Sequence, residues 1–218
     1  MLRFSVATAT ESNEDICIRN MQSPEIVITT SYGELRYDHT KNKRSITRLH
    51  VSKNKAKLKS GQLLNGLSTY KVGAKFNLEA RRQSLESGIT CVYTRKVDLF
   101  LGVTENPVTY VAKEFEEDSC PYNVTLRHEE THQQINQIIL EHYVNLLRKK
   151  VTNFVTSNVV VFEDDNVNML VAEEELHEKL STLVDKHLEE LFMEFESEQA
   201  KLDVSTNYNY DNELCEDE

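Results

Sequence analysis

The sequence predicts an α+β fold in which an N-terminal antiparallel β-sheet packs against a long helix and a second long C-terminal helix. Three observations predict it. Strand-like runs occupy much of residues 25–115, helical periodicity begins near Val124, and a second helical pattern begins near Asn168. The change from a two-residue to a 3.6-residue hydrophobic period separates the sheet from the helices.

Three runs are typical of strands. Residues 25–30 are short and β-branched, and Gly33 follows them. In residues 88–102 and 107–115, apolar and polar side chains alternate over part of each run, so each run offers one face to a core. Neighbouring runs of this kind predict an antiparallel sheet.

Two long helices are expected after the strands. In residues 124–151, apolar side chains recur mostly at intervals of three and four, and Pro121 and Asn123 supply start signals. Residues 168–201 carry a second apolar stripe, with acidic residues near the start that suit the helix dipole. Residues 151–165 between them are expected to be a strand or an extended connection.

Length and composition are those of a globular protein. The chain has 218 residues, of which 39% are hydrophobic and 28% charged, and its length suits one domain. We expect residues 1–22 to be an N-terminal extension, residues 23–206 a single domain and residues 207–218 a polar, acidic tail. No run approaches the roughly 18 consecutive apolar residues that a spanning helix needs, so no transmembrane segment is expected.

The charge balance argues against nucleic-acid binding. The formal net charge is -11, whereas proteins that grip phosphate backbones depend on a dominant basic face. The segment from Lys41 to Lys59 is an exception, because it carries eight basic residues and no acid. Two interpretations stay open for it: a solvated strand-and-loop face, or a contact surface for an anionic envelope partner.

Four cysteines, Cys17, Cys91, Cys120 and Cys215, form no C-x-x-C pair, so neither a redox pair nor a zinc ribbon is indicated. Two disulfides would place the chain in an oxidising compartment, whereas four buried thiols would suit the cytosol. Residues 7–9, Ala-Thr-Ala, look like the end of a signal peptide. The extension at residues 1–22 would then be the remnant of a signal.

The residues most informative about chemistry form an H-E-x-x-H motif, with His128, Glu129 and His132 near the start of the first long helix. Histidines four residues apart on a helix can point at one metal ion, typically zinc. The intervening glutamate can take a proton from a zinc-bound water during attack on a carbonyl. A helix of this kind on a sheet is the arrangement of zincins, so we expect a zincin-like fold. The alternative is an exposed first helical turn with solvated histidines.

A third protein ligand is needed, and the motif does not supply it. The metzincin pattern requires a histidine where this chain has Ile138, which excludes that subclass. The cluster Glu173, Glu174, Glu175 and His177 resembles the downstream glutamate arrangement of gluzincins. Acidic residues at a helix start also serve as simple capping and dipole residues.

Two stretches resemble a group of bacterial exported proteins similar to the secreted zinc-dependent protease family of unknown function. The first runs from Thr109-Tyr110-Val111-Ala112-Lys113-Glu114-Phe115 through Ser119-Cys120-Pro121-Tyr122 into Leu126-Arg127-His128-Glu129 and His132. The second is the run from Gln199 to Tyr208 with the closing Cys215. The likeness covers about residues 87–215 and is strongest around the motif.

The resemblance implies a zinc metallopeptidase with a peptide or protein substrate, in which His128 and His132 bind zinc and Glu129 is the general base. A histidine of the related pattern falls at Tyr208, so the resemblance implies Tyr208 or Asp203 as the third ligand. The gluzincin-like cluster offers Glu174 as the other candidate. The resemblance also implies disulfides from Cys91 to Cys120 and from Cys17 to Cys215, and a periplasmic or secreted location. The alternative function is a non-catalytic envelope or interaction protein with a degenerate zinc site.

Overall fold

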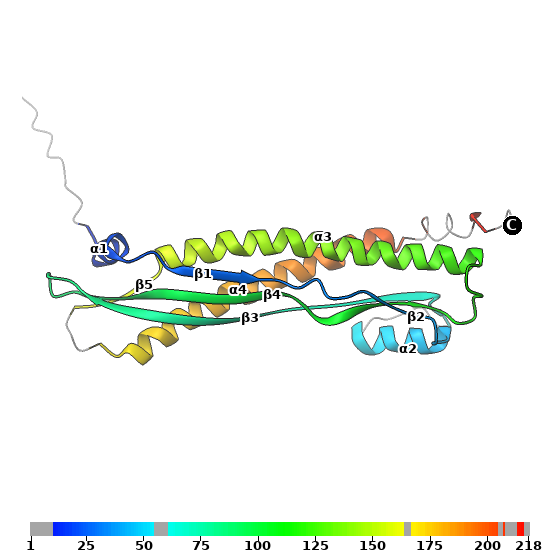
Figure 1. Ribbon diagram of the computed structural model, residues 1–218, viewed down its shortest axis with the longest axis horizontal. Coiled ribbons are helices and arrows are strands. Elements are labelled where there is room, and N and C mark those ends of the chain that lie inside the picture. Colours follow the sequence, from blue (N-terminus) through cyan, green and yellow to red (C-terminus); the bar gives the residue numbers. More distant parts are fainter. Residues whose placement is uncertain (1–10, 55–60, 164–166, 205–206, 208–212, 216–218) are drawn as a thin grey trace, which may run out of the picture. The chain divides into compact units, whose positions relative to one another are not determined.

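The computed structural model describes residues 11–54, 61–163, 167–204, 207 and 213–215. Along the chain the elements follow the order α1, β1, β2, α2, β3, β4, α3, β5 and α4 (Figure 1). They form two compact units. The first is built from the described residues of 1–29, 75–100 and 146–186, and the second from those of 30–74, 101–145 and 187–218.

Five strands form one sheet, and β4 (Thr90–Val111) is the partner that the others share. β1 (Glu25–Thr29) and β2 (Arg36–Asp38) pair in parallel with β4, whereas β5 (Val159–Phe162) pairs antiparallel with it. β3 (Gly66–Ser84) also pairs with β4, which it reaches through the turn at residues 85–89. The fold is therefore mixed α/β, and the expected antiparallel sheet is wrong. Alternation is typical of antiparallel sheets because one face of each strand is solvated, but a parallel pair with one solvated face shows the same pattern.

The first unit contains α1 (Asn13–Asn20), which lies against β5. The Ser12 hydroxyl accepts a hydrogen bond from the Asp15 amide at 3.1 Å, and this cap begins the helix. Cys17 is fully buried beside Cys91, Tyr93 and Val159. β1 runs along β4 in this unit (Figure 1).

The second unit contains α2 (Lys43–Asn54) and the core cluster of Ile46, Leu67 and Ala112. At the start of α2, the Asn42 side chain accepts a hydrogen bond from the Ser45 amide at 2.8 Å. The basic segment is therefore a helix from Lys43 to Asn54, not the expected strand-and-loop face. Its apolar positions are few and separated by basic residues, so the sequence shows only a weak helical period there. Residues 55–60 of this segment lie outside the described chain.

Both expected long helices are present. α3 (Cys120–Ser157) begins after Ser119, whose hydroxyl accepts a hydrogen bond from the Tyr122 amide at 3.4 Å, and it continues beyond the expected end. α4 (Met169–Leu202) matches the second pattern to within two residues. None of the described helices has the length and hydropathy needed to cross a membrane.

All four cysteines are paired, but not as the resemblance implied. The disulfides join Cys17 to Cys91 in the first unit and Cys120 to Cys215 in the second. The implied pairing of Cys91 with Cys120 and of Cys17 with Cys215 is wrong. Connectivity depends on which elements become neighbours, and four cysteines allow three arrangements that the sequence does not distinguish.

Candidate metal centre

The centre lies in the second unit, near the start of α3. His128 and His132 follow one another on the same face of this helix, and each is only 8% exposed. Gln133 and Asn136 are buried on α3 as well, and the buried face becomes apolar from Ile139 onward. The part of α3 that carries the two histidines therefore buries polar side chains, which must find partners.

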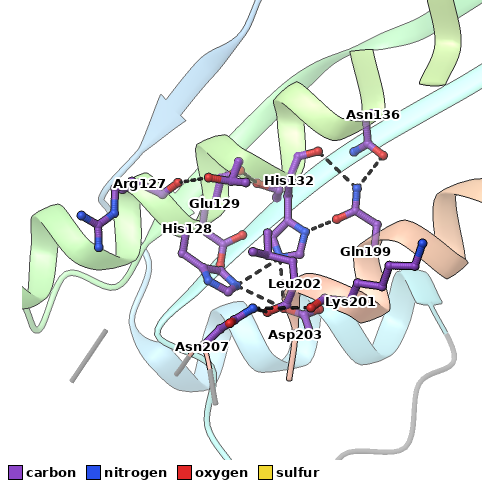
Figure 2. A network of polar contacts seen from close by, with 12 residues as sticks. Arg127, His128, Glu129, His132, Asn136, Gln199, Lys201, Leu202, Asp203 and Asn207 are labelled. Atoms are coloured by element: carbon purple, nitrogen blue, oxygen red, sulfur yellow. Dashed lines mark hydrogen bonds and ion pairs between the residues drawn. The ribbon is translucent and has the colours of Figure 1, made fainter. Parts of the chain in front are cut away.

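Asp203, directly after α4, is the shared polar partner of His128 and His132. Oδ1 of Asp203 lies 3.1 Å from Nε2 of His128 and 3.1 Å from Nε2 of His132, and the two nitrogens lie 3.2 Å apart (Figure 2). In a tetrahedral site with bonds of about 2.0–2.1 Å, neighbouring ligand atoms are about 3.3 Å apart. The three atoms thus form a triangle of the size of one face of such a tetrahedron. This cluster could hold a metal ion.

A second layer of hydrogen bonds fixes the ring of His132. Its Nδ1 contacts Oε1 of Gln199, one turn before Asp203 on α4. The Gln199 amide group donates to Oδ1 of Asn136 at 2.8 Å and to the His132 carbonyl at 3.2 Å (Figure 2). Because Nδ1 is occupied as a donor, Nε2 keeps its lone pair directed at the centre.

Glu129 is buried beside the two histidines, with 7% exposure. Burial raises the pKa of its carboxyl group, although the two histidines and the Ser68 hydroxyl lower it. The start of β3 lies in direct contact with it. A Cβ atom on Gly66 would lie 2.7 Å from both Cγ and Oε1 of Glu129, so only glycine fits here without a shift.

The pKa of His132 is shifted as well. Burial alone would lower the pKa of its imidazole, but hydrogen bonding and charge from Asp203, the charge of Glu129 and the Gln199 contact together raise it. A carboxylate that stabilises a positive imidazole also stabilises a metal cation in the same position. The electrostatics of the cluster therefore favour a cation.

A cleft of about 720 Å³ lies over the centre. Its walls are the start of β3, α3 and the end of α4, and Glu129, His132 and Asp203 all line it. Tyr70 and Phe195 form an aromatic part of the wall, with their ring centroids 5.9 Å apart. The volume lies in the usual range of about 300–1,000 Å³ for small-molecule sites, so the cleft has room for a ligand beside the cluster.

The structure brings His128, His132 and Asp203 together, with Glu129 beside them. Glu174 lies on α4 in the first unit and does not belong to this group. Tyr208 lies outside the described residues. Of the three expected third ligands, Asp203 is therefore the one that the described chain places at the histidines.

Sequence reasoning missed the role of Gln199. A signal was available, because Gln199 and Asp203 are four residues apart at the end of the second helical pattern, the same spacing as His128 and His132. Gly66 and Ser68 carried no comparable signal. Their strand was not expected, and its contact with α3 is a tertiary one.

Comparisons with protein-family models, with curated proteins and with solved structures found no match.

Proposed function

We propose that this chain is a zinc-dependent metallopeptidase, which hydrolyses peptide bonds with water. The observation that carries the proposal is the convergence of His128, His132 and Asp203 within 3.2 Å of one another, next to the buried carboxyl group of Glu129. A metal-binding triad beside a buried acid in an accessible cleft is what metal-assisted hydrolysis requires.

Zinc is the metal that this donor set suits best. Two imidazole nitrogens and one carboxylate oxygen are typical of catalytic zinc sites, which use three protein ligands and keep a fourth position open. The ligand triangle also has the dimensions of a tetrahedral face, whereas calcium and magnesium favour more numerous oxygen ligands.

Zinc and the side chains around it would have separate roles in the reaction. Zinc, when bound, supplies a Lewis acid that polarises the scissile carbonyl and makes water more acidic. Glu129 accepts a proton from the attacking water and donates it to the leaving amine. Its burial raises its pKa, which suits a group that must hold the proton between these two steps. Gln199 and Asn136 hold the His132 ring in place.

We propose further that the protein is exported, as a periplasmic or secreted enzyme. Two disulfides account for all four cysteines of the chain, and such bonds persist in oxidising compartments.

The test compares wild type with Glu129→Gln for zinc content and for cleavage of an unfolded protein such as casein. The variant should keep about one zinc per chain and lose cleavage by at least about 100-fold, because the general base is gone while the ligands stay. Glu130→Gln is the matched control. Glu130 is the next residue on the helix, accepts a hydrogen bond from Tyr37 at 2.8 Å and belongs to neither the triad nor the cleft.

Equal cleavage by wild type and Glu129→Gln would contradict the proposed mechanism. Zinc bound at the triad without cleavage by wild type would instead favour the non-catalytic interaction protein.

A further inference from the structure

We propose, on the basis of the peptidase function above, that a second pocket beside Glu129 is a substrate subsite that binds an apolar side chain and disfavours a basic one. This pocket has a volume of about 420 Å³. It lies on the side of Glu129 where Cys215 joins Cys120 at the start of α3, and we call it the disulfide-side pocket.

The disulfide-side pocket and the cleft over the metal centre meet at Glu129. Leu64, Gly66 and Glu129 line both hollows. Of the metal triad, His132 and Asp203 line the cleft, and His128 lines the disulfide-side pocket. A peptide whose scissile carbonyl is attacked next to Glu129 has residues on both sides of that bond. Two adjoining hollows provide room for the residues on both sides.

Apolar side chains form about half of the wall of the disulfide-side pocket. Leu63, Leu64, Phe115 and Val124 line it, and Leu63 is 48% exposed although it is a large hydrophobic side chain. Leu64 and Phe115 also pack against the core cluster of the second unit, which fixes their positions. A preformed apolar wall beside a reactive centre favours a side chain that buries apolar surface, such as leucine or phenylalanine.

One cation sets the charge preference. Lys43 lines the disulfide-side pocket, with Nζ 4.4 Å from the centroid of the Phe115 ring. Among the described lining residues, Glu129 is the only acid, and the proposed reaction occupies it with the attacking water. A lysine or arginine side chain in this pocket would meet a like charge without an acid free to compensate it.

Binding can be measured apart from catalysis. Isothermal titration calorimetry on zinc-loaded Glu129→Gln protein would use blocked hexapeptides of glycine and alanine with one central leucine, phenylalanine, alanine or lysine. The leucine and phenylalanine peptides should bind at least about tenfold more tightly than the alanine peptide. The lysine peptide should bind no more tightly than the alanine peptide.

Two substitutions in the same protein locate the preference. Val124→Phe should fill the pocket and remove the advantage of leucine and phenylalanine, whereas Ile138→Phe should keep it, because Ile138 is 67% exposed on the same helix and lines neither hollow. Lys43→Glu should improve binding of the lysine peptide by about tenfold, because an attractive charge replaces a repulsive one. Lys149→Glu, on an exposed part of α3, should leave it unchanged.

The subsite and the proposed function fail in different ways. Suppose that apolar peptides bind preferentially, that Val124→Phe removes this preference, and that wild type cleaves nothing. This result would support the apolar subsite and overturn the peptidase function. Cleavage by wild type without any side-chain preference would support the peptidase function and overturn the apolar subsite. Equal binding of all peptides, no binding of any, or an unchanged preference in Val124→Phe would overturn the subsite.

Discussion

Replacing Asp203 by asparagine should weaken zinc binding by roughly 100-fold or more and leave the fold intact. Asp203 supplies the only charged oxygen among the three converging atoms, at 3.1 Å from each histidine nitrogen. The side chain is 46% exposed at the end of α4, so the isosteric amide can be accommodated without burying a new polar group.

The magnitude follows from the number of ligands. Zinc binding at four-ligand protein sites is worth about 10–16 kcal/mol, so each ligand contributes on average about 3 kcal/mol, which corresponds to about 100-fold in affinity. The neutral amide of asparagine is a weaker donor than a carboxylate and cannot neutralise the cation. We therefore expect loss of most of that contribution.

A competition titration against a chromophoric zinc chelator at neutral pH would measure the change. Glu196→Gln is the matched control, because Glu196 lines the same cleft on α4 but does not belong to the triad. It should stay within about threefold of wild type, as expected for a surface charge. An Asp203→Asn affinity within that same range would refute Asp203 as the third ligand, and Tyr208→Phe would then be the next variant to titrate.

Three further predictions address the base, the disulfide and the proton competition. Gly66→Ala should slow peptide cleavage by about 100-fold with zinc retained, because the added methyl group would lie 2.7 Å from the Glu129 side chain. The control, Gly73→Ala on the same strand, should have little effect on the cleavage rate. Equal cleavage rates for the two variants would contradict the role of Gly66. Opening the Cys120–Cys215 disulfide, which links residues 95 apart, by a double serine substitution should cost about 4–5 kcal/mol in denaturant unfolding and weaken zinc binding. Loss of the Cys17–Cys91 disulfide in the first unit should lower stability without weakening zinc binding. Equal losses of zinc affinity after opening either disulfide would contradict a specific effect of Cys120–Cys215 on the metal centre. Burial lowers the pKa of His132, but Asp203 and Glu129 outweigh it and raise this pKa above 6.5. Protons therefore begin to compete with zinc for His132 at a higher pH than they would for an ordinary histidine. Zinc affinity should therefore fall by about tenfold per pH unit below that pKa and level off above it, so a flat profile between about pH 5 and 8 would be inconsistent.

Local patterns were sufficient for the two long helices and for part of the metal centre. The apolar stripes of α3 and α4 repeat within one or two helical turns, so they can be recognised from neighbouring residues. The same holds for His128 and His132, because helix geometry alone puts residues four apart on one face. Asp203 could be named only as one of three alternatives, since no local rule relates the end of one helix to the start of another.

The sequence by itself determined the two long helices, the face on which both histidines lie and the acid between them. The tertiary structure alone decided the parallel pairing of β1 and β2 with β4, the disulfide connectivity and the convergence of Asp203 and Gln199 on the histidines. Strand direction, cysteine pairing and the third ligand all join residues tens of positions apart. Such contacts are set by how the elements pack around a shared core, and periodicity along the chain does not encode them.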